Sequence, residues 1–183
     1  MGFLELLILA VGLAMDSFAV SICKGLALKN AGLKQMCTAG IWFGGFQALM
    51  PCIGYFGSIS FAAYFQNYAH FIAFVLLFFI GAKMIYEAMK SECDTSRNMD
   101  VKTMFVLAVA TSIDALAVGV SFAVLDINLW QSVAIIGIVT FGLSCIGIKI
   151  GTIFGSRWHT LSETIGGVIL ILLGLKILSE KII

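Results

Sequence analysis

The sequence predicts an all-α polytopic membrane protein, and three observations support this prediction. Hydrophobic residues make up 61 % of the 183 residues and charged residues only 11 %, against roughly 45–50 % and about 25 % in soluble domains. One proline and 19 glycines suit long, closely packed helices. The apolar runs are continuous over about 20 residues, whereas the strands of a membrane barrel alternate over about ten. This composition excludes a soluble globular enzyme and a disordered chain.

Six apolar segments are each long enough to span a bilayer. They cover approximately residues 3–26, 36–57, 68–89, 103–125, 130–154 and 162–182. The most polar connection, residues 91–102, lies at the middle of the chain. It separates a first half, residues 1–90, from a second half, residues 103–183, and no stretch is left for a separate soluble domain.

Basic residues indicate how these segments are oriented. Lysine and arginine gather at the first connection (Lys24, Lys29 and Lys34), the third and the fifth, and are absent from the second and fourth. Because cytoplasmic loops carry the excess of positive charge, these three connections should be cytoplasmic and both termini should face outward. The net charge of +1 gives no reason to expect a nucleic-acid partner, and nothing in the sequence indicates an oligomeric state.

The two halves resemble each other at a separation of 98 residues. Each half holds three segments, so the second half enters the membrane from the opposite side, which is the inverted-repeat plan of many secondary transporters. The matching stretches are Leu13-Ala-Met-Asp16-Ser-Phe-Ala-Val20 with Thr111-Ser-Ile-Asp114-Ala-Leu-Ala-Val118, Phe43-Gly44 with Phe141-Gly142, and, after a further shift of five residues, Gly81, Lys83 and Glu87 with Gly174, Lys176 and Glu180.

Asp16 and Asp114 are the strongest candidates for functional residues. Each lies near the middle of an otherwise apolar segment, at equivalent positions of the two halves. A charged side chain at the bilayer centre costs about 2.5–3.5 kcal/mol on insertion scales, and acids inside membrane segments are usually functional. Two carboxylates facing one cavity would suit a divalent cation such as Mn²⁺, Mg²⁺ or Ca²⁺. The alternative is a pair of protonated acids that bond neighbouring helices.

Polar residues in the same segments are candidate supporting ligands. Gln47 lies in the middle of its segment, four residues before Pro51. A proline removes the hydrogen bond to the carbonyl of Gln47, so this carbonyl could bind a cation, or the proline could simply kink the helix. Further oxygen ligands could come from Ser17, Thr111 and Ser112.

Three other residues are open to two interpretations each. Met15 could add a soft thioether ligand, although methionine in such a helix more often faces lipid or the apolar core. His70 and Glu163 begin the third and sixth segments at equivalent positions. They could carry protons or bind the cation at an entrance, or they could lie solvated at the membrane interface.

Small residues accompany both acids along one helix face and allow neighbouring backbones to approach closely. If the two stripes face each other across the axis between the halves, the two carboxylates come close together. The stripes are Ser17, Ser21 and Gly25 in the first half, and Ala115, Gly119 and Ala123 in the second.

Four motifs carry a family resemblance that covers essentially the whole chain: Leu-Ala-Met-Asp16-Ser-Phe-Ala-Val-Ser21 with Lys24-Gly25, Ala-Thr-Ser-Ile-Asp114-Ala-Leu-Ala-Val-Gly119, Phe43-Gly with Met50-Pro51 and Gly54, and Gly81-Ala-Lys-Met-Ile-Tyr-Glu87. They resemble the bacterial MntP family of manganese efflux pumps, in the LysE-type exporter superfamily. The resemblance implies a transporter of the cytoplasmic membrane that exports Mn²⁺ as its substrate and needs no cofactor. It also implies that the family's paired acids are Asp16 and Asp114. Composition and spacing by themselves reach only a divalent-cation transporter.

Other functions fit the sequence less well. A membrane enzyme of phosphate chemistry needs clustered polar residues, whereas the only arginines, Arg97 and Arg157, lie in connections. A thiol-redox carrier would need paired cysteines at equivalent positions, which the chain lacks. An exporter of another small solute or cation of the same superfamily is the remaining alternative to a manganese exporter.

Overall fold

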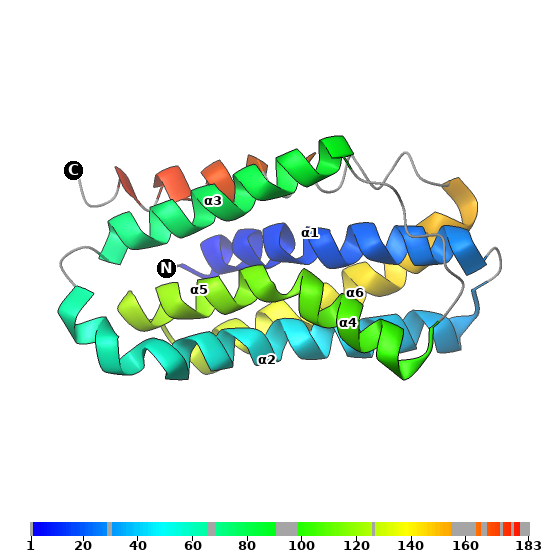
Figure 1. The fold of residues 1–183 in the computed structure, drawn as a ribbon, viewed down its shortest axis with the longest axis horizontal. Helices are drawn as coiled ribbons and strands as arrows, with labels where there is room; N and C mark the ends of the chain where they lie inside the picture. Colours follow the sequence, from blue (N-terminus) through cyan, green and yellow to red (C-terminus); the bar gives the residue numbers. More distant parts are fainter. Residues whose placement is uncertain are drawn as a thin grey trace.

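A computed structural model shows an all-helical architecture over the residues that it describes. These residues are 2–28, 31–65, 69–90, 99–125 and 127–154, with 164–165, 168–172, 174–176 and 178–179 of a C-terminal segment whose described residues are also helical. No strand occurs within these ranges. The helices are α1 (Phe3–Leu28), α2 (Leu33–Phe65), α3 (Ala69–Lys90), α4 (Val101–Thr111), α5 (Ile113–Val124) and α6 (Leu129–Phe154), and they run along the long axis of the molecule (Figure 1).

The observed helices agree closely with the predicted segments. Helices α1, α3 and α6 match the first, third and fifth segments within two residues at each end, whereas α2 continues eight residues past its predicted end at 57. The sixth predicted segment lies partly outside the described residues. Among the helices searched, α1, α2 and α6 are long and apolar enough to cross a membrane, and α4 and α5 together make a fourth candidate span.

The fourth predicted segment is broken, which the sequence analysis did not foresee. Helices α4 and α5 meet at an angle of 43°, and Ser112 between them is not helical. The Ser112 hydroxyl donates to the carbonyl of Ala108 at 2.5 Å, a side-chain bond that competes with regular helix bonding. Asp100 starts α4 by accepting hydrogen bonds from the backbone N–H and the hydroxyl of Thr103.

Glycines bring α1 into backbone contact with α6. A Cβ atom added at Gly25 would lie 2.2 Å from the carbonyl oxygen of Ile148, and one added at Gly151 would lie 2.0 Å from that of Ile22. No side chain fits at such distances, so the two helices touch through their main chains. Contacts of this kind replace the hydrophobic driving force that helices lack inside lipid.

The same kind of contact joins α2 to α5. A Cβ atom added at Gly54 would lie 2.1 Å from the carbonyl oxygen of Leu116, and one added at Gly119 would lie 2.2 Å from that of Pro51. The expectation that the two small-residue stripes face each other is therefore wrong. The stripe of α1 packs on α6 and that of α5 packs on α2, because the partner helices carry glycines where the backbones cross.

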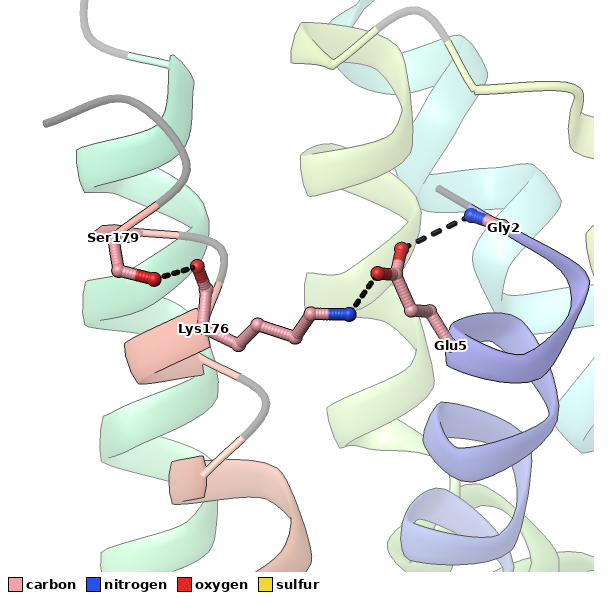
Figure 2. A network of polar contacts seen from close by, with 4 residues as sticks. All are labelled: Gly2, Glu5, Lys176 and Ser179. Carbon is pink, nitrogen blue, oxygen red and sulfur yellow. Dashed lines mark hydrogen bonds and ion pairs between the residues drawn. The ribbon is translucent and has the colours of Figure 1, made fainter. Parts of the chain in front are cut away.

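The C-terminal segment lies against α1 and α3. An added Cβ at Gly12 would meet the Leu170 side chain at 2.9 Å, and Gly174 packs on Leu77 of α3. Figure 2 shows that Lys176 forms an ion pair with Glu5, whose other carboxylate oxygen accepts a hydrogen bond of 3.0 Å from the N–H of Gly2. The segment is therefore held to the beginning of α1 by packing and by charge.

Large apolar side chains cover the outer surface of the bundle. Phe79 of α3 is 76 % exposed, Ile138 of α6 is 72 % and Ile41 of α2 is 66 %. Such exposure is costly in water and natural in lipid, where these side chains contact acyl chains.

The close helix contacts predict that glycine substitutions differ in effect by position. Gly25→Ala and Gly119→Ala should each destabilise the protein by about 1–3 kcal/mol, because the helices must separate to accommodate the methyl group. The measurement is the thermal unfolding midpoint of each purified variant in detergent.

Gly45→Ala and Gly142→Ala are the matched controls, since an added Cβ at either position meets nothing within 4 Å. They should leave the midpoint unchanged or raise it slightly, because alanine favours the helix over glycine. Equal effects of all four substitutions would contradict the packing described here.

Candidate cation site

A polar junction forms where α1 and α2 meet the break between α4 and α5. The Ser17 hydroxyl donates to the Thr111 hydroxyl oxygen at 3.4 Å, and the side-chain N–H of Gln47 donates to the Leu13 carbonyl at 3.1 Å. Ser17 and Gln47 are fully buried, and Thr111 is 6 % exposed. We use the name polar junction for these residues together with Ser112, Asp114 and Asp16.

Asp114 lies in the first turn of α5 and is buried, with 8 % of its surface exposed. Its Oδ1 atom accepts a hydrogen bond of 2.8 Å from the N–H of Ala115, and its Oδ2 atom has no hydrogen-bond partner among the described residues. The Gln47 side chain and the charge of Lys83 in α3 are both near enough to act on this carboxyl group. The Gln47 Oε1 atom is likewise buried without a described partner.

Asp16 is half-buried in α1 and precedes Ser17 directly. Asp114 follows Thr111 by three residues, so each acid is close in sequence to one partner of the hydrogen bond between Ser17 and Thr111. Asp16 also shares a helix face with Glu5 and Gly12, at the i, i+7 and i+11 positions of one stripe. Contacts of Glu5 and Gly12 show that this face meets the C-terminal segment.

The structure brings most of the predicted site residues together. Ser17 and Thr111 share a hydrogen bond, Gln47 bonds to Leu13 one turn before Ser17, and Ser112 and Asp114 follow Thr111 at the helix break. Asp16 precedes Ser17 in the chain, but the face of α1 that carries it is directed toward the C-terminal segment. Among the described residues, no group of three or more His, Cys, Asp or Glu side chains lies close enough together to hold a metal ion. A cation at the polar junction would therefore be held by two carboxylates and neutral oxygens.

The remaining candidates lie elsewhere. Met15 packs against the apolar core, in agreement with the structural interpretation of this residue. His70 is in the first turn of α3, but its side chain lies outside the described part of the structure, as does Glu163. Lys24 was expected beside the first connection. Instead, Lys24 is 1 % exposed within α1. The positive charge at the first connection therefore depends on Lys29 and Lys34.

Three further hydroxyl groups are buried, of which sequence reasoning named Ser21 only as a small residue and did not single out the other two. Ser21 of α1 and Thr140 and Ser144 of α6 are fully buried, and their oxygens have no hydrogen-bond partner among the described residues. The spacing of Thr140 and Ser144 on an apolar helix was a signal, but hydroxyl groups in membrane helices commonly bond to their own backbone and therefore attract little notice.

Comparison with known proteins identifies the family. Residues 30–178 match the family model Mntp, described as "Putative manganese efflux pump". A protein of Campylobacter jejuni is 52 % identical over 184 residues, covering 100 % of this chain and 98 % of its own. Proteins of Acetivibrio thermocellus and Bifidobacterium adolescentis are each 48 % identical, covering 100 % and 98 % of this chain and 93 % and 97 % of their own. All three are named "Putative manganese efflux pump MntP".

No solved structure matches the chain. The family match covers most of the sequence, and the relatives cover nearly all of it. Together with the long apolar helices, this match confirms the expectation of a multi-pass membrane transporter that is not an enzyme. The chain belongs to the MntP family.

Proposed function

We propose that this chain exports Mn²⁺ from the cytoplasm across the bacterial cytoplasmic membrane, and that Asp16 and Asp114 bind the ion together near the middle of the bilayer. The polar junction is the observation that carries this proposal. It holds the buried Asp114 Oδ2 and Gln47 Oε1 atoms, which have no described partner, within a bundle whose core is mostly apolar. Membership in a family of manganese efflux pumps supports Mn²⁺ as the substrate.

The chemistry of the polar junction suits a hard divalent cation. Two carboxylates can balance the double charge, and the Gln47 amide and the hydroxyls of Ser17 and Thr111 are neutral oxygens of the kind that complete such a shell. A buried acceptor without a partner costs about 1–3 kcal/mol. A bound cation would relieve this cost at Asp114 and Gln47 together.

Equivalent contacts in the two halves support an inverted repeat. Gly54 of α2 packs on the Leu116 carbonyl of α5, and Gly147 of α6 packs on the Phe18 carbonyl of α1, with added Cβ atoms 2.1 and 2.8 Å from the respective oxygens. Phe18 and Leu116 are 98 residues apart, as the repeat predicts. The two contacts are thus equivalent when the halves are exchanged, and each of them joins one half to the other.

The contacts favour a different register for the second helix of each half. Gly54 and Gly147 are 93 residues apart, and so are Gly44 and Gly137, which contact each other. A residue contacts its own equivalent only near the axis that relates the halves. This geometry supports an axis through the contact of Gly44 with Gly137. It also implies that the five-residue shift precedes α2, whereas the match of Phe43-Gly44 with Phe141-Gly142 had placed it later.

We propose six membrane spans arranged as two repeats, residues 1–90 and 103–183, joined by a cytoplasmic loop, residues 91–102. Length and composition identify up to four candidate spans. The spans of α3 and of the C-terminal segment bring the proposed number to six. Both termini face outward, because the basic residues gather at the first, third and fifth connections. In this orientation, the second repeat enters the membrane from the side opposite to the first.

Removing either charge of the proposed site should nearly abolish export. Asp16→Asn and Asp114→Asn keep the shape of each side chain, but an amide is a weaker ligand, and the remaining acid cannot balance a double charge alone in a low-dielectric site. The measurement is Mn²⁺ efflux from loaded cells at matched membrane levels of each variant.

Asp100→Asn is the control for this pair, because Asp100 is an exposed cap outside the spans and asparagine also caps helices. It should export Mn²⁺ like the unmodified protein. Substantial export by both Asp16→Asn and Asp114→Asn would show that the acids only bond neighbouring helices.

Gln47 should contribute to affinity for the ion. Gln47→Leu removes the Oε1 ligand, and we expect the Mn²⁺ concentration at half-maximal transport to rise about tenfold or more. The measurement is Mn²⁺ uptake into everted membrane vesicles. Gln131→Leu changes an exposed glutamine of α6 and should have no effect. An unchanged half-maximal concentration in Gln47→Leu would show that Gln47 does not bind the ion and serves only to bond α2 to Leu13.

The orientation can be tested with single cysteines in a cysteine-free background. Asn128→Cys and Gly32→Cys both introduce exposed thiols between helices. We expect a membrane-impermeant maleimide to label position 128 in intact cells and position 32 only after permeabilisation. The reverse pattern would invert the proposed topology.

A further inference from the structure

A polar pocket lies at the end of the bundle where α1 and α6 begin. It measures about 210 Å³, and its lining includes Leu6 of α1, Leu125 directly after α5, and Asn128, Gln131 and Ser132 at the start of α6. Asn128 and Gln131 are exposed, so the pocket opens at the surface. In the proposed topology this end of the bundle faces outward. We use the name outer pocket for the space that these side chains line.

Helices α1 and α5 lead from the polar junction to the outer pocket. At one end the Ser17 hydroxyl donates to that of Thr111 at 3.4 Å, and at the other end Leu6 and Leu125 line the same pocket. The two helices therefore lie side by side in opposite directions over this stretch. Ser17 follows Leu6 by eleven residues, which places the junction roughly 16 Å from the pocket along the helix axis.

Four apolar side chains fill the interval between the polar junction and the outer pocket. Each is at most 1 % exposed, and all four belong to one cluster of buried residues. They are Leu9 and Leu13 of α1 and Val118 and Phe122 of α5. We use the name apolar plug for these four side chains.

Helical spacing places the apolar plug on the helix faces that carry the polar groups. In α1, Leu9 and Leu13 precede Ser17 by eight and four residues. In α5, Val118 and Phe122 follow Asp114 by four and eight residues. Residues at these spacings share one face of a helix. The plug therefore lies in line with the polar junction and the outer pocket.

Three further elements pack around the plug. Leu77 of α3, Ile136 of α6 and Leu170 of the C-terminal segment belong to the same buried cluster, and none of them is more than 2 % exposed. A narrow apolar constriction does not retain water, and a cation that enters it loses its hydration without gaining ligands. In this structure the polar junction is therefore closed toward the outer pocket.

We propose that the apolar plug is the outer gate of the transport path, and that the exported divalent cation leaves the bundle through the outer pocket. This inference rests on the proposed function and its topology. Main-chain contacts at glycines join α1 to α6 and α5 to α2, whereas α1 and α5 meet at the plug through side chains. Export then requires these two tightly joined helix pairs to separate at the plug.

Val118→Thr tests the gate, because threonine keeps the shape of valine and adds a hydroxyl that holds water. In a cysteine-free background, Thr111→Cys reports on access to the polar junction from outside. We expect a membrane-impermeant thiol reagent to label position 111 of intact cells slowly, and about tenfold faster or more when Val118→Thr is added. Position 128, changed by Asn128→Cys, gives the rate for a thiol outside the gate.

Phe122→Ala opens the plug by removing volume and provides a second reading that does not depend on Val118→Thr. It should also speed the labelling of position 111. Right-side-out vesicles with this variant and no energy source should admit Mn²⁺ several-fold faster than vesicles with the unmodified protein, because an open gate lets the ion follow its gradient.

Val106→Thr and Phe79→Ala are the matched controls. They make the same two changes at side chains that are 56 % and 76 % exposed on the outer surface. Both should leave the labelling of position 111 and the entry of Mn²⁺ unchanged. Membrane levels and thermal unfolding midpoints of all variants are compared, so that a misfolded protein is not counted as an open gate.

The outcomes separate this inference from the proposed function. Unchanged labelling of position 111 in both Val118→Thr and Phe122→Ala would overturn the gate, as would labelling of position 111 as fast as that of position 128 with the plug intact. Faster labelling in the plug variants, with normal export by Asp16→Asn and Asp114→Asn, would support the gate and overturn the proposed ion site. An unmodified protein that does not transport Mn²⁺ would overturn both.

Discussion

Backbone contact between helices at glycine residues is the interaction on which the rest of this structure depends. At Gly25 and Gly151 the chains of α1 and α6 touch without any intervening side chain, and at Gly54 and Gly119 those of α2 and α5 do the same. Inside lipid, apolar side chains gain nothing by leaving one hydrocarbon environment for another, so tight van der Waals contact must hold the helices together. A single methyl group at the crossing would push the pair apart.

This packing determines where polar atoms can be placed. Because the helices approach so closely, the turns beside each crossing are shielded from lipid, and Ser17, Gln47 and Thr111 can be buried there. The break at Ser112 then exposes irregular backbone inside the bundle, where hydroxyl groups satisfy it. Irregular backbone at membrane depth is tolerated only when protein or a cavity surrounds it. The polar junction and the broken helix therefore require each other.

Much of the candidate site could be found from the sequence because charge and polarity are rare in this chain. Asp16, Asp114 and Gln47 stand out against apolar neighbours, and the structure bonds the buried Gln47 side chain to the Leu13 carbonyl of α1. Thr140 could not be found in the same way. Its burial depends on how α6 packs against α1 and α2, which the spacing of residues along the chain does not determine. The buried position of Lys24 also escaped prediction, because a lysine near a helix end normally reaches the interface.

The sequence by itself determined the all-helical class, the approximate positions of most helices and the pair of acids as candidates. These follow from hydrophobicity summed along the chain and from the cost of charge in lipid, and both act at each residue separately. Only the tertiary structure decided which helices are partners, where the fourth segment breaks and which hydroxyls are buried. A stripe of small residues shows that a helix has a close neighbour, but many helices offer the same surface. The neighbour of α1 is α6 because Gly147 and Gly151 meet it where the two backbones cross.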